Sequence, residues 1–306
     1  LEIYAAEFGY GYDWLNAEIE AFKNTDWVKE KYPNLNIPAV KHNSTRSYAI
    51  DRIMQGETNT IDLLFAVASG ADKYESTYGN NQPYFENLTS VYSAIVPGEN
   101  VTFAEKLDDN FLKMNTFVKL SGETSYYSVP WVSGMQGMLY NKTMFDELNL
   151  SEPRTTDELS ALCAKLVAAG KTPFIFTSRE NYWTCMMFLI WWAQYEGEEY
   201  IADFYKNPSP EKYQNREGLK KALKIIEDLI CTGEGKAKNS MEGAMAKNHL
   251  LMQKDFVQYK SAMISGYYGI INETKGYIDP DCDLKVFFPA IEGAKTDLAV
   301  VDLLAE

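Results

Sequence analysis

Aromatic side chains follow several predicted strands of this 306-residue chain, at the points where each strand gives way to a loop. Open α/β sheets bind small ligands at the carboxyl ends of their strands. Tyr and Trp rings combine an apolar face with a polar tip, so they can stack on a sugar while nearby carboxylates and amides bond its hydroxyls. The pattern therefore indicates carbohydrate recognition. The residues concerned are Tyr10, Tyr12, Trp131, Glu180, Tyr182, Trp183, Tyr267 and Tyr268.

Each of these aromatic residues also has a plainer interpretation, which is packing inside a hydrophobic core. For a single ring that role is the more common one. Four clusters at matching positions after strands favour a shared ligand cleft instead. Ser69 is a further candidate, because it lies in a long irregular stretch, residues 68–99, of a kind that is often functional.

The first 66 residues alternate between strand-like and helix-like segments. Apolar runs at 1–6, 37–40 and 62–66 predict strands. Helical spacing from Asp13 onward and over 48–55 predicts the intervening helices. This βαβαβ alternation is typical of a parallel α/β sheet.

The rest of the chain continues the mixture of strands and helices. Residues 156–169 form the clearest predicted helix, with Thr155 and Glu158 at capping-box spacing and Gly170 at its end. Residues 184–195, 219–230 and 244–256 predict further helices, and Leu219, Leu223, Ile226 and Ile230 are expected to face inward. Residues 126–131, 173–176, 261–265 and 284–288 predict strands.

The composition excludes several classes of partner and site. With 29 Lys and Arg against 43 Asp and Glu, the net charge is −14, which disfavours a nucleic-acid partner. Only His42 and His249 are present, so a three-histidine zinc site is excluded. The four cysteines form no CxxC pair, and we expect free thiols, mostly buried. The longest apolar run, residues 185–193, is too short to span a membrane.

Two short motifs imitate cofactor or metal sites and fail on inspection. Gly9 and Gly11 begin a dinucleotide-binding pattern, but Trp14 stands where the third glycine belongs. The acidic run 279–283 begins like a calcium loop, but Leu284 and Ala290 replace the required Gly and Glu. We therefore predict no cofactor and no metal.

Several motifs, in order along the chain, resemble those of family 1 extracellular solute-binding proteins. The segment YSVPWVSGMQGMLYNK at 127–142, followed by MF at 144–145 and PRTTDEL at 153–159, resembles the "P…YNK..F…P.T.DEL" signature of that family. KSAMISGYY at 260–268, VFFP at 286–289 and NTID at 59–62 are similar to further family segments. The resemblance spans nearly the whole chain.

The resemblance implies a two-lobed α/β fold with the ligand between lobes that crossing strands join. Carried over, one lobe is residues 1–130 with a return at about 290–306, and the other is 138–285. The hinge segments become 128–136, which includes Gln136 as a ligand-binding candidate, and 288–293. Glu180 to Trp183 resembles an acidic–aromatic sugar-binding loop of the family, and Tyr268 falls where a stacking Trp is frequent.

The same resemblance implies a protein that captures an oligosaccharide and passes it to a membrane-embedded ABC permease, acting as a monomer and without catalysis. Its place would be the extracellular face of the cytoplasmic membrane, as a bacterial lipoprotein whose signal and anchor have been removed ahead of Leu1. Family members usually continue beyond the last hinge, so we expect additional C-terminal helices past Glu306 in a complete fold.

Two alternatives remain open at this point. The abundance of carboxylates permits a glycoside hydrolase, which needs a pair of them at a separation of about 5–10 Å. A solute-binding protein for a polyamine or a peptide is the other alternative. The sequence determines neither the sugar nor its linkage and length.

Overall fold

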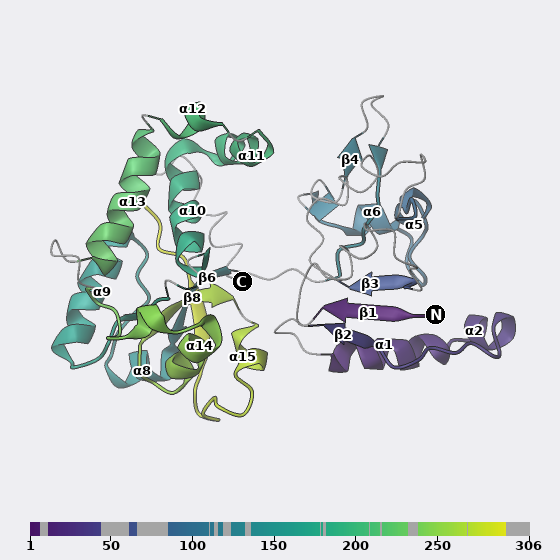
Figure 1. Cartoon of the computed structure of the whole chain (residues 1–306), viewed down its shortest axis with the longest axis horizontal. Coiled ribbons are helices and arrows are strands. Elements are labelled where there is room, and N and C mark those ends of the chain that lie inside the picture. Colours follow the sequence, from purple (N-terminus) through teal and green to yellow (C-terminus); the bar gives the residue numbers. More distant parts are fainter. Residues whose placement is uncertain are drawn as a thin grey trace. The chain divides into compact units, whose positions relative to one another are not determined.

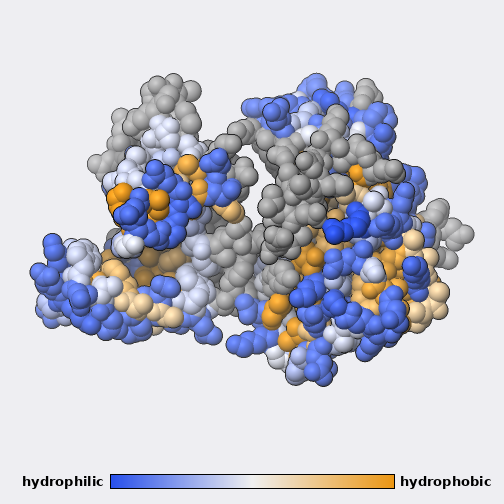
Figure 2. Space-filling view, turned by 180° about the vertical axis from the view of Figure 1, so that it is seen from behind, coloured by the Kyte–Doolittle hydropathy of each residue, from blue (hydrophilic) through white to orange (hydrophobic). Residues whose placement is uncertain are grey.

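The structure, a computed structural model, divides into two compact units, Leu1–Ser133 and Gly134–Glu306. The residues described are 1–6, 12–43, 61–65, 85–109, 111–112, 116–118, 124–131, 136–177, 179, 182–207, 209–214, 216–231, 238–267 and 269–291. Figure 2 shows mostly hydrophilic residues on the described surface, with smaller hydrophobic patches among them.

Unit 1 is built on a parallel sheet, as the βαβαβ pattern predicted. Its strands lie in the order β2-β1-β3, and both neighbours of β1 run parallel to it. The helices α1 and α2 follow β1 in the chain (Figure 1). The strand β2 begins just after the expected 37–40 segment, and the expected helix at 48–55 lies outside the described residues. The bounds are β1 Ile3–Ala6, α1 Asp13–Lys23, α2 Asp26–Lys31, β2 Lys41–Asn43 and β3 Leu63–Phe65.

A small apolar cluster joins α1 to this sheet. Ile3 and Ala5 from β1 pack with Leu15 of α1 and with Val40. Leu15 is buried in this cluster, whereas Phe22 in the last turn of α1 is exposed. Tyr12 takes the N-cap position of α1, and Asp13 is the first residue of the helix.

The remainder of unit 1 corrects one sequence prediction. The expected strand at 126–131 is absent from the described residues, because the antiparallel pair ends at Ser125. The carbonyl of Tyr126 instead accepts a hydrogen bond from the Leu88 amide at 2.7 Å, and Pro130 has no N–H to give to a ladder. The elements here are α5 Thr89–Tyr92, α6 Phe103–Lys106, β4 Phe117–Val118 and β5 Thr124–Ser125.

Unit 2 contains a mixed sheet in the order β7-β8-β6-β9. The strand β7 is parallel to β8, whereas β6 is antiparallel to both β8 and β9. Helices cover both of its faces. The bounds are β6 Gln136–Asn141, α8 Lys142–Glu147, α9 Thr156–Ala168, β7 Phe174–Ile175, α10 Tyr182–Glu196, α11 Glu198–Lys206, α12 Pro210–Tyr213, α13 Glu217–Ile230, the 3-10 turn η1 Ala244–Ala246, α14 His249–Val257, β8 Met263–Tyr267, α15 Ile270–Glu273 and β9 Leu284–Phe287.

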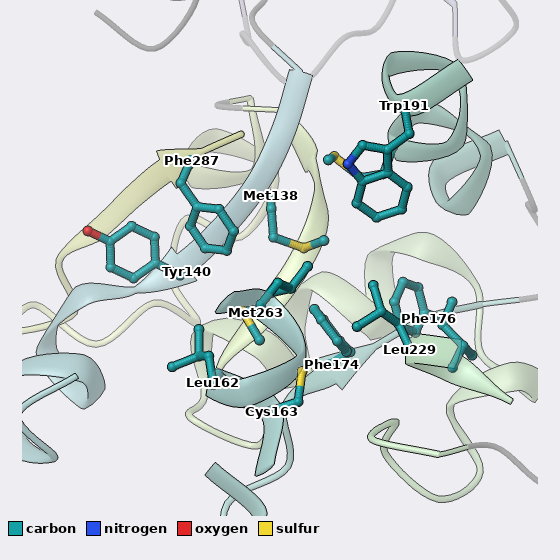
Figure 3. Close-up of a cluster of buried hydrophobic side chains, with 14 of the residues drawn as sticks. Met138, Tyr140, Leu162, Cys163, Phe174, Phe176, Trp191, Leu229, Met263 and Phe287 are labelled. Atoms are coloured by element: carbon teal, nitrogen blue, oxygen red, sulfur yellow. The ribbon is translucent and has the colours of Figure 1, made fainter. Parts of the chain in front are cut away.

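Two hydrophobic clusters fill the two faces of this sheet, as alternating side chains along a strand require. Met138 and Tyr140 of β6 point into the cluster under α9, α10 and α13, together with Trp191 (Figure 3). Leu139 points the other way, into the cluster with α14 and α15 that includes Phe256. The sheet is therefore buried on both sides.

The helix α9 carries its capping residues where the sequence placed them. The Thr155 hydroxyl accepts a hydrogen bond from the Glu158 amide at 3.1 Å. The Glu158 carboxylate bonds the Arg154 amide at 2.6 Å, one residue before the expected partner. The buried stripe along α9 is formed by Leu159, Leu162, Cys163 and Leu166.

Two further helix predictions need correction. In α13 the buried residues are Gly218, Ala222, Leu229 and Ile230, whereas Leu223 is exposed rather than inward-facing. The predicted helix 244–256 is interrupted, because a 3-10 turn ends before Lys247 and α14 begins anew. The side chain of Asn248 caps that second start by accepting the Leu251 amide at 2.9 Å.

The chain after β9 is tied to α9 and α10. The Trp191 indole donates to the Pro289 carbonyl at 2.8 Å, and the Gln194 side chain accepts the Ile291 amide at 2.9 Å. The Ala290 amide donates to the Arg154 carbonyl at 2.9 Å. The assignment of 288–293 as a hinge and of 290–306 to the first lobe stays a prediction, since residues 292–306 lie outside the described part.

The described cysteines carry free thiols, as the sequence predicted, but only one of these three is buried. Cys163 is buried in the α9 stripe, Cys282 is half-buried and Cys231 is exposed. Burial raises the pKa of the Cys163 thiol to about 12, more than the nearby Lys238 lowers it. Cys163 is therefore an inert core residue.

Candidate functional site

Three aromatic rings meet beyond the sheet of unit 1. Trp131 stacks on Trp14, with ring centroids 4.1 Å apart and planes 16° from parallel. Phe65 stands edge-on to both, at 5.4 Å from Trp14 and 5.9 Å from Trp131. Phe65 ends β3 and Trp14 lies in the first turn of α1 after β1, so the cluster forms at the carboxyl edge of the parallel strands.

The segment that carries Trp131 is held by neighbouring aromatic residues. Tyr126 stacks on Tyr92 of α5 at 3.8 Å, and the Tyr92 hydroxyl donates to the Ser128 carbonyl at 2.8 Å. Burial, with a smaller contribution from Tyr126, raises the pKa of Tyr92 to about 12. The Tyr92 hydroxyl therefore keeps its proton at neutral pH and remains a donor to this segment.

Of the candidates predicted in unit 1, the structure places two. Trp131 joins the aromatic cluster and is half-buried. Tyr12 is half-buried at the N-cap of α1, where it packs against the small apolar cluster of β1 and α1. Tyr10 and Ser69 lie outside the described residues.

Sequence reasoning missed Trp14 and Phe65. Trp14 entered the sequence argument only as the residue that breaks a dinucleotide motif, and Phe65 only as part of a buried strand. Both occupy the position, just at or after the end of a strand, that selected the other aromatic candidates. The same positional rule could have found them.

In unit 2 the strand register brings further candidates to one edge of the sheet. Gln136 begins β6 and pairs directly with Tyr267, the last residue of β8. The strand β7 runs parallel to β8, so its carboxyl end faces the same edge. Tyr182 and Trp183 follow it in the first turn of α10, rather than in the loop that the sequence predicted. Glu180 and Tyr268 lie outside the described residues.

Tyr267 is positioned by the turn that follows β8. Its hydroxyl donates to the Glu273 carboxylate at 2.7 Å. Its ring lies over Gly269 so closely that a Cβ there would stand 2.0 Å from a ring carbon. Residue 269 must therefore be a glycine for the Tyr267 ring to keep this position.

The β7 end of this edge is fixed by a buried hydroxyl. Thr177 donates to the carbonyl of Lys247 and accepts the Arg179 amide at 3.1 Å. Because Thr177 is buried, these bonds satisfy a group that would otherwise cost stability. They also fix the course of the chain toward the start of α10.

Neither metal chemistry nor a membrane span appears in the described part of the chain. No group of three or more His, Cys, Asp or Glu side chains there could hold a metal ion. No described helix is both long enough and apolar enough to cross a bilayer. At the sheet edges, the described residues present aromatic rings and polar side-chain groups.

Comparison with known proteins identifies the family of the chain. The profile of the bacterial extracellular solute-binding proteins matches residues 5–305. The chain belongs to this family. Membership places the protein among solute-binding proteins rather than among enzymes, and confirms the resemblance noted in the sequence.

One relative and several solved structures extend the comparison. A multiple sugar-binding protein of Streptococcus mutans is 37% identical over 75 residues, which are 24% of this chain and 18% of that protein. RafE of Streptococcus pneumoniae, solved with raffinose, shares the fold with a TM-score of 0.63 at 17% identity, over 96% of this chain and 69% of RafE.

Two further solved structures support the same fold. A protein from a study of xylan utilisation by Caldanaerobius polysaccharolyticus gives a TM-score of 0.67 at 18% identity, over 97% of this chain and 70% of its own. The bacterial solute receptor AcbH gives 0.62 at 18% identity, over 95% of this chain. The chain spans 66% of the length of AcbH. The two-lobed α/β fold class predicted from the sequence is thus confirmed.

Replacement of Gly269 by Ala tests the placement of Tyr267. The added Cβ must displace the Tyr267 ring and break its bond to Glu273, since the ring is the more mobile partner. We expect sugar affinity to fall about tenfold, equivalent to about 1.4 kcal/mol, in isothermal titration calorimetry. Ile271→Ala, an exposed change in the same turn, serves as the control and should leave affinity unaltered. Unchanged affinity in a folded Gly269→Ala protein would remove Tyr267 from the site.

Proposed function

We propose that this protein captures an oligosaccharide outside the cell and delivers it, as a monomer, to a membrane-embedded ABC permease, with no chemistry of its own. The observation that carries the proposal is the stacked pair Trp131 and Trp14 with Phe65 at the carboxyl edge of unit 1. Such rings offer the apolar surface on which a pyranose stacks. Lipid anchoring at the outer face of the membrane belongs to the same proposal.

The charge of the chain and the residue types at the two sheet edges support a neutral ligand. The chain has a net charge of −14, which opposes anionic solutes. Tyr267 and Gln136 come to one edge of unit 2 and are of residue types that bond hydroxyl groups. The relatives named above include a sugar-binding protein and a receptor solved with raffinose, which supports the same class of ligand.

We propose further that ligand is held between two lobes, residues 1–130 with 290–306 and residues 138–285. The segments 128–136 and 288–293 would be the crossings. The stacked Trp131 stands in the first crossing, so it is the candidate most directly placed to sense the ligand.

Calorimetry against a panel of solutes tests the proposal. The panel holds raffinose, xylotriose, chitotriose, maltotriose and galactose, with spermidine and a tripeptide as non-sugar competitors. We expect at least one neutral oligosaccharide to bind with a Kd of about 1 μM or tighter, which corresponds to about −8 kcal/mol. Binding of spermidine or the tripeptide alone would overturn the sugar assignment.

A second measurement separates capture from hydrolysis. The oligosaccharide that binds is incubated with the protein, and new reducing ends are assayed over a day. We expect none above the protein-free control. A steady release of reducing ends would replace the binding function with that of a glycoside hydrolase.

A further inference from the structure

Three large aromatic side chains lie exposed on the helices α1 and α2, away from the aromatic cluster of the candidate site. Phe22, Trp27 and Tyr32 are 39%, 53% and 51% exposed. The ring centroids of Phe22 and Trp27 are 6.5 Å apart, and those of Trp27 and Tyr32 are 5.2 Å apart. The three rings therefore form one continuous array, which we call the α1–α2 platform.

The backbone turn between α1 and α2, which carries the platform, is held by hydrogen bonds. The Thr25 hydroxyl donates to the Phe22 carbonyl at 2.9 Å and accepts the Val28 amide at 3.3 Å, so it caps α2 and fixes the turn from α1. Val28 is buried, and its carbonyl accepts the Tyr32 amide at 2.8 Å. The backbone that carries the rings is thus ordered before any ligand arrives, which lowers the entropy cost of binding.

The platform lies at the opposite end of α1 from the candidate site. Trp14 is in the first turn of α1, and Phe22 is in its last turn. Figure 1 shows α1 running back along the sheet from the carboxyl end of β1, with α2 beyond it. An eleven-residue helix is about 16 Å long, so the platform is a separate surface within unit 1.

Charge and area at the platform point to a neutral ligand and not to a protein. The surrounding side chains carry both signs, with Asp26 and Glu30 beside Lys29 and Lys31. Aromatic side chains bury about 150–250 Å² each, so three half-exposed ones offer about 300 Å². A stable protein interface needs about 800 Å² on each partner. The platform is too small for that and has no net charge for an ionic partner.

We propose that Phe22, Trp27 and Tyr32 form a second carbohydrate-binding surface, which holds a neutral, soluble polysaccharide chain outside the candidate site. The rings would stack on the apolar C–H faces of successive sugar units, and the flanking charged groups would bond the hydroxyls. Neighbouring ring planes are tilted by 47° and 57°, so the surface is twisted. A flexible chain can follow such a surface, whereas a flat crystalline face cannot. This inference stands independently of the proposed function.

Affinity electrophoresis can test the platform before the sugar is identified. The protein is run in native gels that contain soluble starch, arabinoxylan or hydroxyethylcellulose, with polygalacturonate as an anionic probe. We expect retardation in at least one neutral gel and none in polygalacturonate. Trp27→Ala and Tyr32→Ala should each raise the dissociation constant from these gels at least tenfold. Tyr277→Ala, a tyrosine of 52% exposure in unit 2, is the matched control and should change nothing.

Each outcome decides the proposal. Absence of retardation in every neutral gel, or retardation that both platform variants retain, would overturn it. Retardation by polygalacturonate alone would overturn the neutral ligand class. Circular dichroism and melting temperature confirm that the variants fold, which exposed positions should permit. Calorimetry on Trp27→Ala should give an oligosaccharide affinity within twofold of the unaltered protein, so that failure here and failure of the proposed function remain distinguishable.

Discussion

Trp131→Ala is expected to weaken oligosaccharide binding about 30-fold, the largest affinity change that we predict. Aromatic anchors at binding surfaces are commonly worth about 2 kcal/mol or more, and every 1.4 kcal/mol is a factor of ten. Trp131 is half-buried, with one face on Trp14 and its edge near Phe65. Its remaining surface is the one on which a pyranose would stack. Titration calorimetry with the best oligosaccharide of the panel measures the change.

The matched control is Trp131→Phe, which keeps an aromatic face over Trp14 and should cost less than fivefold. Melting temperatures of both variants separate binding from packing. If Trp131 only fills a core, its truncation would lower the melting temperature through a cavity and leave affinity intact. A large fall in melting temperature with unchanged affinity would therefore contradict the role of Trp131 in the site.

The aromatic cluster also shows which parts of the candidate site could be predicted from the sequence. Trp131 could be selected because it follows an apolar segment, although that segment is not a strand. Its partners Trp14 and Phe65 come from two other parts of the chain, more than 60 residues away from it. Ring stacking is a tertiary contact. A local pattern of apolar residues therefore does not predict which ring from a distant part of the chain will stack on Trp131.

In unit 2 the local patterns predicted β7, β8, β9 and the longer helices, but not how the strands pair. The sequence placed Tyr267 after a predicted strand, and the family resemblance placed Gln136 in a hinge segment. Only the antiparallel register of β6 and β8 puts the two directly opposite each other. Tyr182 and Trp183 were expected in a loop, and they begin α10 instead. Helix α10 is apolar all round, so periodicity gives no clear sign of where it starts.

The ion pairs of a buried carboxylate could not be predicted from the sequence. Asp255 lies in α14 and is largely buried between two lysines, Lys247 before the helix and Lys260 after it. Lys260 bonds one carboxylate oxygen at 2.6 Å, and Lys247 bonds the other. In the sequence the three are ordinary charged residues, because burial depends on how β8 and α14 pack.

Asp255→Asn is expected to lower the free energy of unfolding of unit 2 by about 2–3 kcal/mol at pH 7. Breaking a buried ion pair costs about 3–5 kcal/mol, and exposed pairs are worth about 0–1 kcal/mol. The Asp255 side chain is only 9% exposed, while those of Lys247 and Lys260 are 26% and 48% exposed, so the expected value lies between these limits. Urea unfolding, followed by hydrogen exchange of the α14 and β8 amides, measures it for unit 2 alone.

The control for this change is Asp228→Asn in α13. Asp228 pairs with Lys224 at 2.6 Å, at a similar distance to the Asp255 bonds, but both side chains are mostly exposed. We expect a loss of no more than about 0.5 kcal/mol there. Equal effects of the two substitutions would show that burial of Asp255 contributes nothing.

The loss of unfolding free energy caused by Asp255→Asn should also depend on pH. Burial by itself raises the pKa of Asp255, but the hydrogen bonds from Lys247 and Lys260 outweigh it and hold the pKa below its usual value. A carboxyl whose pKa is lower in the folded state stabilises the fold above its unfolded pKa of about 3.9 and loses that contribution as the pH falls through the folded pKa. The difference in free energy of unfolding between the unaltered protein and Asp255→Asn should therefore be constant from pH 7 to about 5 and narrow below about pH 4.

Since the Lys247 carbonyl also accepts the Thr177 hydroxyl bond at the end of β7, the same acidification should loosen the edge of unit 2 that leads to α10. A difference in free energy of unfolding that stays constant down to pH 3 would show that the Asp255 carboxylate is not stabilised by its lysines.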